Sequence, residues 1–119
     1  MPPEERDTAS LWDMLEAARE AVEFTKGMSF QQFAANAASR RAVERDLEII
    51  GEASRRMSAA FRTQHPQIPW ADIIGLRNII SHDYDRVDYV RIHDIAAREL
   101  PELIDKLAPL VPPPPEMDG

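Results

Sequence analysis

Cysteine is absent from this chain of 119 residues, and glycine is scarce, with four residues in all. The absence of cysteine excludes a disulfide scaffold, a zinc site with cysteine ligands and a thiol nucleophile. It is compatible with a reducing compartment, and we expect a cytoplasmic protein. No apolar run approaches the roughly 20 residues of a membrane-spanning helix. The polar N-terminus, MPPEERDTAS, also lacks the apolar region of a signal peptide.

Several catalytic signatures are missing as well. The three histidines, His65, His82 and His93, have no i,i+4 spacing to one another and so do not form a metal site on one helix. The chain has neither a glycine-rich phosphate loop nor a G-x-S-x-G nucleophile motif. We therefore expect neither a metal ion nor another cofactor. We expect His65 to lie in a loop and His93 to be solvated on the polar side of a helix.

Positive charge is in short supply, and a net charge of −7 argues against general nucleic-acid binding. Residues 1–26 carry seven acidic and three basic side chains, and residues 85–119 carry eight and four, a net −4 in each segment. Residues 27–84 carry six acidic side chains and seven arginines, a net +1. Within them, Arg45, Glu48, Glu52 and Arg55 are spaced to pair along one side of a helix. This distribution is compatible with an anion-facing middle segment, but ordinary solvated charge is the simpler interpretation.

What the sequence does contain is apolar residues at helical spacing. Hydrophobic residues make up 44% of the chain, enough for the core of one domain. With little glycine and no strand-like alternation, the spacing predicts an all-α bundle of four main helices plus short helical turns. The expected main helices span residues 8–26, 36–57, 69–84 and 87–107, and the expected short turns span 29–33 and 58–66.

Local signals refine this outline. The S-x-x-Q pattern at Ser29 predicts a capping box. Gly51 lies inside the expected helix 36–57, where it costs about 1 kcal/mol relative to alanine, so it predicts a close contact with another helix. Pro101 predicts a kink or break near residues 99–100. We expect residues 1–110 to form a single domain and residues 111–119, VPPPPEMDG, to form a flexible proline-rich tail.

The stretch RNIISHDY, residues 77–84, places polar groups at the edge of an apolar helix face. At about 100° per residue, Leu76, Ile80 and Tyr84 lie within about 60° of Ile73 and form the core stripe. Arg77 lies at about 40°, at the edge of that stripe. The polar residues that continue around the helix from there are Ser81, Asn78 and His82.

Ile79 lies well off this core stripe. A helix that is apolar on two sides usually packs against a second partner. A homodimer interface is the simplest source of that second surface. The polar strip would then border a groove between two packed surfaces.

Arginine and histidine together suit phosphoryl chemistry. Taken singly, Arg77 in an ion pair and His82 as a half-exposed surface residue are the simpler explanations. As a pair, the arginine stabilises the charge of a phosphodiester and the histidine transfers a proton near neutral pH. RNA needs nothing more, because its own 2′-OH is the nucleophile and no metal is required.

RNIISHDY resembles the R-x4-H-x-Y motif of the HepT-like HEPN ribonuclease toxins. The blocks AVERDLEIIGEASRRM and IPWADIIGLRN are also similar to that group, and the resemblance extends over residues 11–110. It implies a HEPN-type bundle of four main helices. It also implies a metal-independent endoribonuclease that leaves a 2′,3′-cyclic phosphate and acts as the toxin of a type VII toxin–antitoxin system. Transfer RNA is the target that the resemblance suggests.

The resemblance implies roles for single residues. Arg77 and His82 match the catalytic pair, and Asn78 matches the supporting polar residue. Tyr84 matches the tyrosine that a cognate minimal nucleotidyltransferase antitoxin modifies with AMP. The family forms homodimers in which the two motifs face a shared cleft.

The negative net charge of the chain opposes the binding of RNA, which is itself negatively charged. Asp83 adds negative charge beside the motif histidine, and arginines such as Arg40, Arg41 and Arg45 would have to gather in the dimer cleft to offset it. The alternative function is a non-catalytic helical partner that uses the same surface to dock a nucleotidyltransferase. The intact motif favours the ribonuclease.

Overall fold

The computed structural model describes residues 3–82 and 88–112, and within them the side chains of residues 5–80 and 88–112. These ranges contain helices and no strand, so the all-α prediction is confirmed. No helix in them is long and apolar enough to cross a membrane. The elements are α1 (Pro3–Thr25), α2 (Phe30–Ala35), α3 (Ala37–Arg56), α4 (Ala59–Gln64), α5 (Trp70–His82), α6 (Tyr89–Asp94), the π-helical segment η2 (Ile95–Glu99), α7 (Leu100–Leu107) and the 3-10 turn η3 (Ala108–Leu110).

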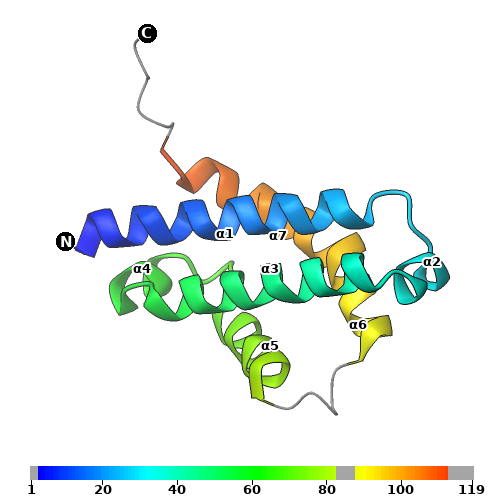
Figure 1. Ribbon diagram of the computed structural model, residues 1–119. Helices are drawn as coiled ribbons and strands as arrows, with labels where there is room; N and C mark the ends of the chain where they lie inside the picture. Colours follow the sequence, from blue (N-terminus) through cyan, green and yellow to red (C-terminus); the bar gives the residue numbers. More distant parts are fainter. Residues whose placement is uncertain (1–2, 83–87, 113–119) are drawn as a thin grey trace, which may run out of the picture.

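The bundle is built on an antiparallel pair of long helices. α1 and α3 lie side by side over most of their length, and α7 packs against α1 (Figure 1). α5 packs against α3 and extends away from α1, on the other side of the pair (Figure 1). The helix that carries the motif is therefore held mainly by α3.

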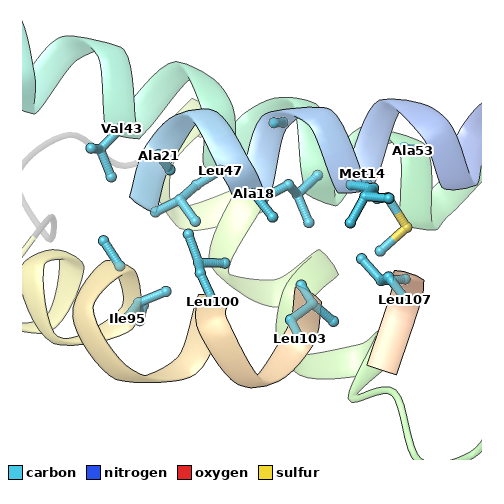
Figure 2. Close-up of a cluster of buried hydrophobic side chains, with 14 of the residues drawn as sticks. Met14, Ala18, Ala21, Val43, Leu47, Ala53, Ile95, Leu100, Leu103 and Leu107 are labelled. Carbon is cyan, nitrogen blue, oxygen red and sulfur yellow. The ribbon is translucent and has the colours of Figure 1, made fainter. Parts of the chain in front are cut away.

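The core fills the space where α1, α3 and α7 meet. Alanines on α1 let its neighbours approach closely, and longer side chains of the other two helices fill the remaining volume. The side chains seen in Figure 2 include Met14, Ala18 and Ala21 of α1, Val43, Leu47 and Ala53 of α3, Ile95 of η2, and Leu100, Leu103 and Leu107 of α7. A polar contact closes one end of the pair, because the carboxylate of Asp7 accepts hydrogen bonds from the N–H and hydroxyl of Ser58 at 2.8 and 2.7 Å.

Most helix boundaries lie within two residues of those expected from the sequence, and the start of α1 is the exception. α1 begins at Pro3 rather than at residue 8, and Gly27 follows it with a φ of 75°, which glycine adopts without strain. The predicted capping box is present. The Ser29 hydroxyl accepts from the N–H of Gln32 at 3.1 Å, and the Gln32 side-chain oxygen accepts from the N–H of Ser29 at 2.9 Å.

The predicted break in the last helix takes the form of a π-helical segment. Pro101 has no N–H to donate, and its ring displaces the backbone one turn earlier. The chain widens over Ile95–Glu99, and the N–H of Leu100 donates to the carbonyl of Ile95, five residues back. α7 then begins at Leu100 with Pro101 in its first turn, where proline is tolerated.

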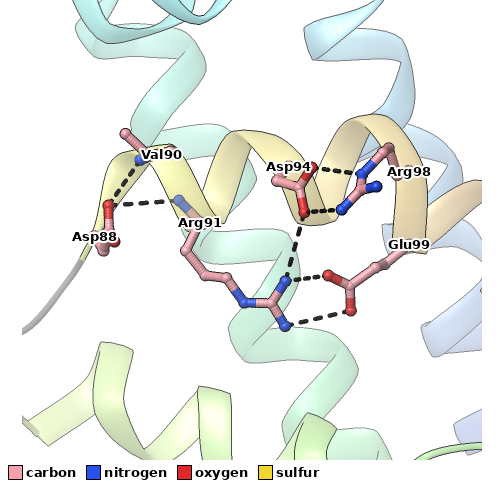
Figure 3. A network of polar contacts seen from close by, with 6 residues as sticks. All are labelled: Asp88, Val90, Arg91, Asp94, Arg98 and Glu99. Atoms are coloured by element: carbon pink, nitrogen blue, oxygen red, sulfur yellow. Dashed lines mark hydrogen bonds and ion pairs between the residues drawn. The ribbon is translucent and has the colours of Figure 1, made fainter.

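A polar network covers the outer side of this break (Figure 3). Arg91 forms ion pairs with Glu99 and, at 3.7 Å, with Asp94. Asp94 also binds Arg98 at 2.6 Å. Asp88 caps α6 by accepting from backbone N–H groups of the first turn. These ion pairs connect side chains of α6 with side chains of η2, the irregular segment itself.

His93 differs from the sequence-based expectation. Its ring is half-buried rather than solvated, with Nε2 3.0 Å from the carbonyl oxygen of Met28 and the ring near Phe30 and Phe33. This side chain ties α6 to the α1–α2 connection, a contact that its position next to Asp94 in the sequence did not reveal. His65, expected in a loop, follows the end of α4.

Asp46 of α3 is an ionisable group in the core. Its side chain is 1% exposed, and one carboxyl oxygen has no hydrogen-bond partner among the described residues. Burial, together with a hydrogen bond to Glu20 of α1, raises the pKa of Asp46 to about 8. At neutral pH the carboxyl is therefore largely protonated in the folded protein and donates to Glu20.

A raised pKa in the folded state means that the folded protein holds a proton that the unfolded chain releases. This group therefore lowers the stability progressively as the pH rises from about 4 to about 8. Asp46→Asn keeps a donor toward Glu20 but does not titrate. We expect its free energy of unfolding, relative to the unsubstituted protein, to rise by about 2–4 kcal/mol between about pH 5 and pH 9. Urea unfolding at the two pH values measures this, with the exposed site Asp105→Asn as the control; parallel profiles for Asp46→Asn would contradict the assignment.

Candidate active site

α5 carries three of the four predicted site residues. Arg77, Asn78 and His82 all lie in this helix. His82 is its last residue, one helical turn beyond Asn78, and its side chain lies outside the described part. Tyr84 also lies outside the described residues. The geometry of the site therefore rests on Arg77, Asn78 and what surrounds them.

The position of Arg77 depends on a glycine of the neighbouring helix. A Cβ atom added to Gly51 of α3 would lie 2.2 Å from the Cβ of Arg77 and 2.6 Å from its Cγ. The stem of the arginine thus occupies the space that any other residue at position 51 would fill. The close helix contact predicted from Gly51 is confirmed, and it involves the motif arginine itself.

Glu52, the next residue along α3, contacts the guanidinium end of the Arg77 side chain. The guanidinium of Arg77 lies 3.4 Å from a carboxylate oxygen of Glu52, and it donates to the side-chain oxygen of Asn78 at 3.3 Å. Its Nε is inaccessible and has no hydrogen-bond partner among the described residues. The arginine side chain remains 23% exposed. Its terminal nitrogens are oriented and still within reach of solvent.

Glu52 is shared between two arginines. Arg55, one turn along α3, donates to its second oxygen at 3.0 Å, as the helical spacing predicted. That hydrogen bond, with the positive charges of Arg55, Arg77 and Arg56, lowers the pKa of Glu52. The glutamate is therefore ionised at neutral pH. Its contact with Arg77 was not predicted, although its place beside Gly51 was a signal that could have indicated it.

A polar cleft of about 350 Å³ opens at the guanidinium, and we call it the Arg77 cleft. Its lining residues are Asp13 of α1, Arg45, Glu48, Ile49, Glu52 and Arg56 of α3, and Arg77 of α5. Three carboxylates face three guanidinium groups, so the cleft is close to neutral. The acids pair with the arginines directly, Glu48 with Arg45 at 3.8 Å and Asp13 with Arg56 at 3.0 Å.

Of the arginines expected to gather near the site, only Arg45 lines the cleft. Arg40 lies near the other end of α3, where it binds the carbonyl of Ala34 and its guanidinium stacks 5.3 Å from the ring centre of Tyr89. Arg41, its neighbour on α3, is exposed. Within a single chain, Arg40 therefore lies away from the Arg77 cleft, and the gathering of arginines in a dimer cleft stays a prediction.

α5 is apolar on more than one side, as Ile79 suggested. Ile73, Ile74, Leu76 and Ile79 are all half-buried, and among these four only Ile73 and Leu76 pack against the core. A helix of this composition at the edge of a bundle leaves apolar surface for a further partner.

The residues that the structure describes contain no group of three histidine or acidic side chains placed to hold a metal ion. The chemistry available at the Arg77 cleft is that of an oriented guanidinium beside an amide. A guanidinium presents parallel donors, so this arrangement has the chemistry to bind an anion with several oxygens.

Comparison with known proteins adds a family. A family model described as "Ribonuclease HepT-like" matches residues 14–110. The protein named "Putative RNase MJ1380" of Methanocaldococcus jannaschii is 43% identical over 95 residues, which cover 80% of this chain and 87% of the relative. The "Probable ribonuclease HepT" of Thermococcus cleftensis is 35% identical over 100 residues, covering 84% of this chain and 91% of the relative. No solved structure matches the chain significantly.

The contact at Gly51 leads to a stability test. Gly51→Ala places a methyl group against the stem of Arg77, so α3 and α5 must separate. We expect a net loss of roughly 1–3 kcal/mol in the free energy of unfolding, in spite of the better helix propensity of alanine. Gly75→Ala on α5 is the control, because its Cβ would meet nothing within 4 Å. That variant should be more stable by up to about 1 kcal/mol. Denaturant unfolding compares the two, and equal gains in stability would contradict the close contact.

Proposed function

Because this chain belongs to the HepT-like ribonuclease family, we propose that it is a metal-independent endoribonuclease and the toxin of a type VII toxin–antitoxin system. The observation that carries the proposal is the setting of Arg77. Its stem is fixed against Gly51, its guanidinium lies between Glu52 and Asn78, and its terminal nitrogens face an open cleft. Arg45 and Arg56 also line this cleft, but the stem of Arg77 alone among the three is fixed against a glycine of the neighbouring helix.

The proposed reaction uses the RNA as its own nucleophile. The 2′-oxygen attacks the adjacent phosphorus while the bond from phosphorus to the 5′-oxygen breaks, which leaves a 2′,3′-cyclic phosphate and a 5′-hydroxyl. Arg77 stabilises the negative charge that develops on the phosphate oxygens. His82 transfers the proton, from the 2′-OH or to the 5′-oxygen. Asn78 keeps the guanidinium in the orientation in which it meets the phosphate.

We propose a homodimer as the active form. α5 packs mainly on α3 and leaves Ile74 and Ile79 half-buried, which supports a partner along this helix. Two copies would bring two His82 residues to one cleft, one for each proton transfer. Light scattering at micromolar concentration measures the assembly, and a monomer would exclude the shared cleft.

One observation favours the alternative of a non-catalytic docking partner. The Arg77 cleft has as many carboxylates as guanidinium groups in its lining, so it does not attract a polyanion by its net charge. A nucleotidyltransferase could meet such a surface through matched ion pairs. The two functions differ in one measurable property, which is whether the purified protein cuts RNA.

Purified, unmodified protein should cleave RNA in the presence of EDTA. Arg77→Ala and His82→Ala should each lower the cleavage rate by about 100-fold or more, because one removes the charge that meets the phosphate and the other removes the proton transfer. Arg98→Ala is the matched control, since it removes an equal charge from an exposed site on η2. Circular dichroism should show unchanged helicity in all three. Full activity in His82→Ala would remove that histidine from the mechanism.

Tyr84 is the proposed site of control. A cognate minimal nucleotidyltransferase with ATP and magnesium should add one or more AMP units to its hydroxyl, which would place a phosphodiester and a bulky adenosine near Arg77. The modified protein should lose its ribonuclease activity.

The chain offers a matched control for this modification, because it has a second tyrosine. Tyr89 is half-buried, and a hydrogen bond with Glu44 raises the pKa of its hydroxyl. Intact-mass spectrometry should show the AMP adduct on Tyr89→Phe but not on Tyr84→Phe. An adduct that persists in Tyr84→Phe would identify a different acceptor.

A further inference from the structure

A second hollow lies beside the motif. A groove of about 650 Å³ runs between α4 and α5, and we call it the α4/α5 groove. Its lining residues are Ala59, Arg62 and Thr63 of α4 and Trp70, Ala71, Ile74, Gly75 and Asn78 of α5. Asn78 borders this groove and also binds Arg77, which lines the cleft. The hollow therefore begins next to the proposed catalytic arginine.

Arg62 is unlike the other arginines of the middle segment. Arg40, Arg62 and Arg77 are the three that are half-buried. Arg40 is held by a carbonyl and an aromatic ring, and Arg77 by a carboxylate. Arg62 has no acidic partner among the described residues, and its Nε is inaccessible and lacks a hydrogen bond there. A buried Nε–H without an acceptor is unfavourable, and no acid offsets the charge of Arg62, so the groove is suited to an incoming anion.

The lining of the groove differs in charge from that of the Arg77 cleft. No aspartate or glutamate lines the groove, whereas three line the cleft. The lining of the groove thus carries one positive charge and no negative charge, although the protein as a whole is acidic. The groove therefore complements a polyanion, whereas the Arg77 cleft is close to neutral.

Gly75 provides a second, independent observation. It lies inside α5, where glycine is unfavourable compared with alanine, and a Cβ added to it would meet nothing within 4 Å. Gly51 is explained by packing within the chain, but Gly75 is not. Ala71, Gly75 and Asn78 follow one face of α5, and position 82 continues that face by one more turn. A strip of the helix without bulky side chains therefore runs through the groove toward His82.

We propose that the α4/α5 groove binds the RNA strand next to the bond that is cut, with Arg62 contacting one of its phosphates. This inference rests on the proposed ribonuclease function. The strand passes from the guanidinium of Arg77 over Asn78 and along the face of Gly75, where the sugar–phosphate backbone comes close to the helix. Trp70 also lines the groove, but it is only 8% exposed and its Nε1 donates to the carbonyl of His65 at 3.0 Å, so it offers little ring surface on which a base could stack. The groove therefore holds the backbone and adds little base preference.

The test measures RNA binding separately from cleavage. A fluorescein-labelled, short single-stranded RNA is titrated into protein that carries His82→Ala, which leaves the RNA uncut, and anisotropy gives the Kd. In this background, Arg62→Gln is compared with Arg98→Gln, which removes an equal charge from an exposed site on η2. We expect Arg62→Gln to raise the Kd about five- to tenfold, and Arg98→Gln to change it by less than about twofold. The slope of log Kd against log salt should fall by about 0.7 in Arg62→Gln.

Two further variants keep the result interpretable. Arg62→Lys retains the charge and should recover most of the affinity, which a defect in folding would not allow. Gly75→Ala should raise the melting temperature and still weaken RNA binding, because the methyl group meets the RNA rather than the protein. Unchanged affinity in Gly75→Ala would contradict the close approach of the strand.

Three outcomes would overturn the assignment of the groove. The first is equal affinity of Arg62→Gln and Arg98→Gln. The second is a loss of mass in light scattering for Arg62→Gln, which would make the groove a contact between copies of the chain. The third is an unchanged salt dependence. Failure of the ribonuclease proposal looks different: the unsubstituted protein would bind RNA through Arg62 and not cut it.

Discussion

The close approach of α3 and α5 at Gly51 is the constraint on which the site depends. α5 is held mainly by α3, and the stem of Arg77 fills the space left by the missing side chain of Gly51. The next residue, Glu52, then points its carboxylate at the guanidinium. Two consecutive residues of α3 thus act on the same arginine. Gly51 leaves room for its stem, and Glu52 forms an ion pair with its guanidinium. Together they fix both ends of the arginine.

Much of this architecture follows from local sequence signals. Helical spacing, the cap at Ser29 and the stop at Gly27 each act within a few residues, and the structure contains all three. Gly51 indicated a close helix contact because a glycine inside a helix needs a reason. The break before Pro101 was predictable for the same kind of reason, although its π-helical form was not.

The parts that escaped prediction depend on the register between helices. The pair of Glu52 and Arg77 joins α3 to α5, and the contact of His93 with Met28 joins α6 to the α1–α2 connection. A helical pattern states which residues share a face, but not which residue of another helix they meet. The predicted pair of Glu52 and Arg55 was correct because both belong to one helix. His82 and Tyr84 remain predictions, since their side chains lie outside the described part.

Net charge is a poor guide to where this protein could meet an anion. The middle segment has one more base than acids, yet most of its arginines near the cleft are neutralised by carboxylates within 4 Å. What distinguishes one arginine from another is the local partner. The two sides of α5 thereby differ, with a neutral cleft at Arg77 and an acid-free groove at Arg62.

The ion pair of Glu52 with Arg77 suits the proposed reaction, in which a phosphate of the RNA would replace the carboxylate beside the guanidinium. Their contact of 3.4 Å is longer than the 2.7–2.9 Å typical of a strong charge-assisted hydrogen bond, while Arg55 holds the other oxygen of Glu52 at 3.0 Å. A phosphate that binds the terminal nitrogens of Arg77 in two places would form stronger bonds than the one it replaces. Glu52 would keep its hydrogen bond from Arg55, and its other oxygen, which has no hydrogen-bond partner among the described residues, would lose only the ion pair with Arg77. In the proposed reaction, the glutamate therefore orients the arginine before RNA arrives without holding it too tightly to release.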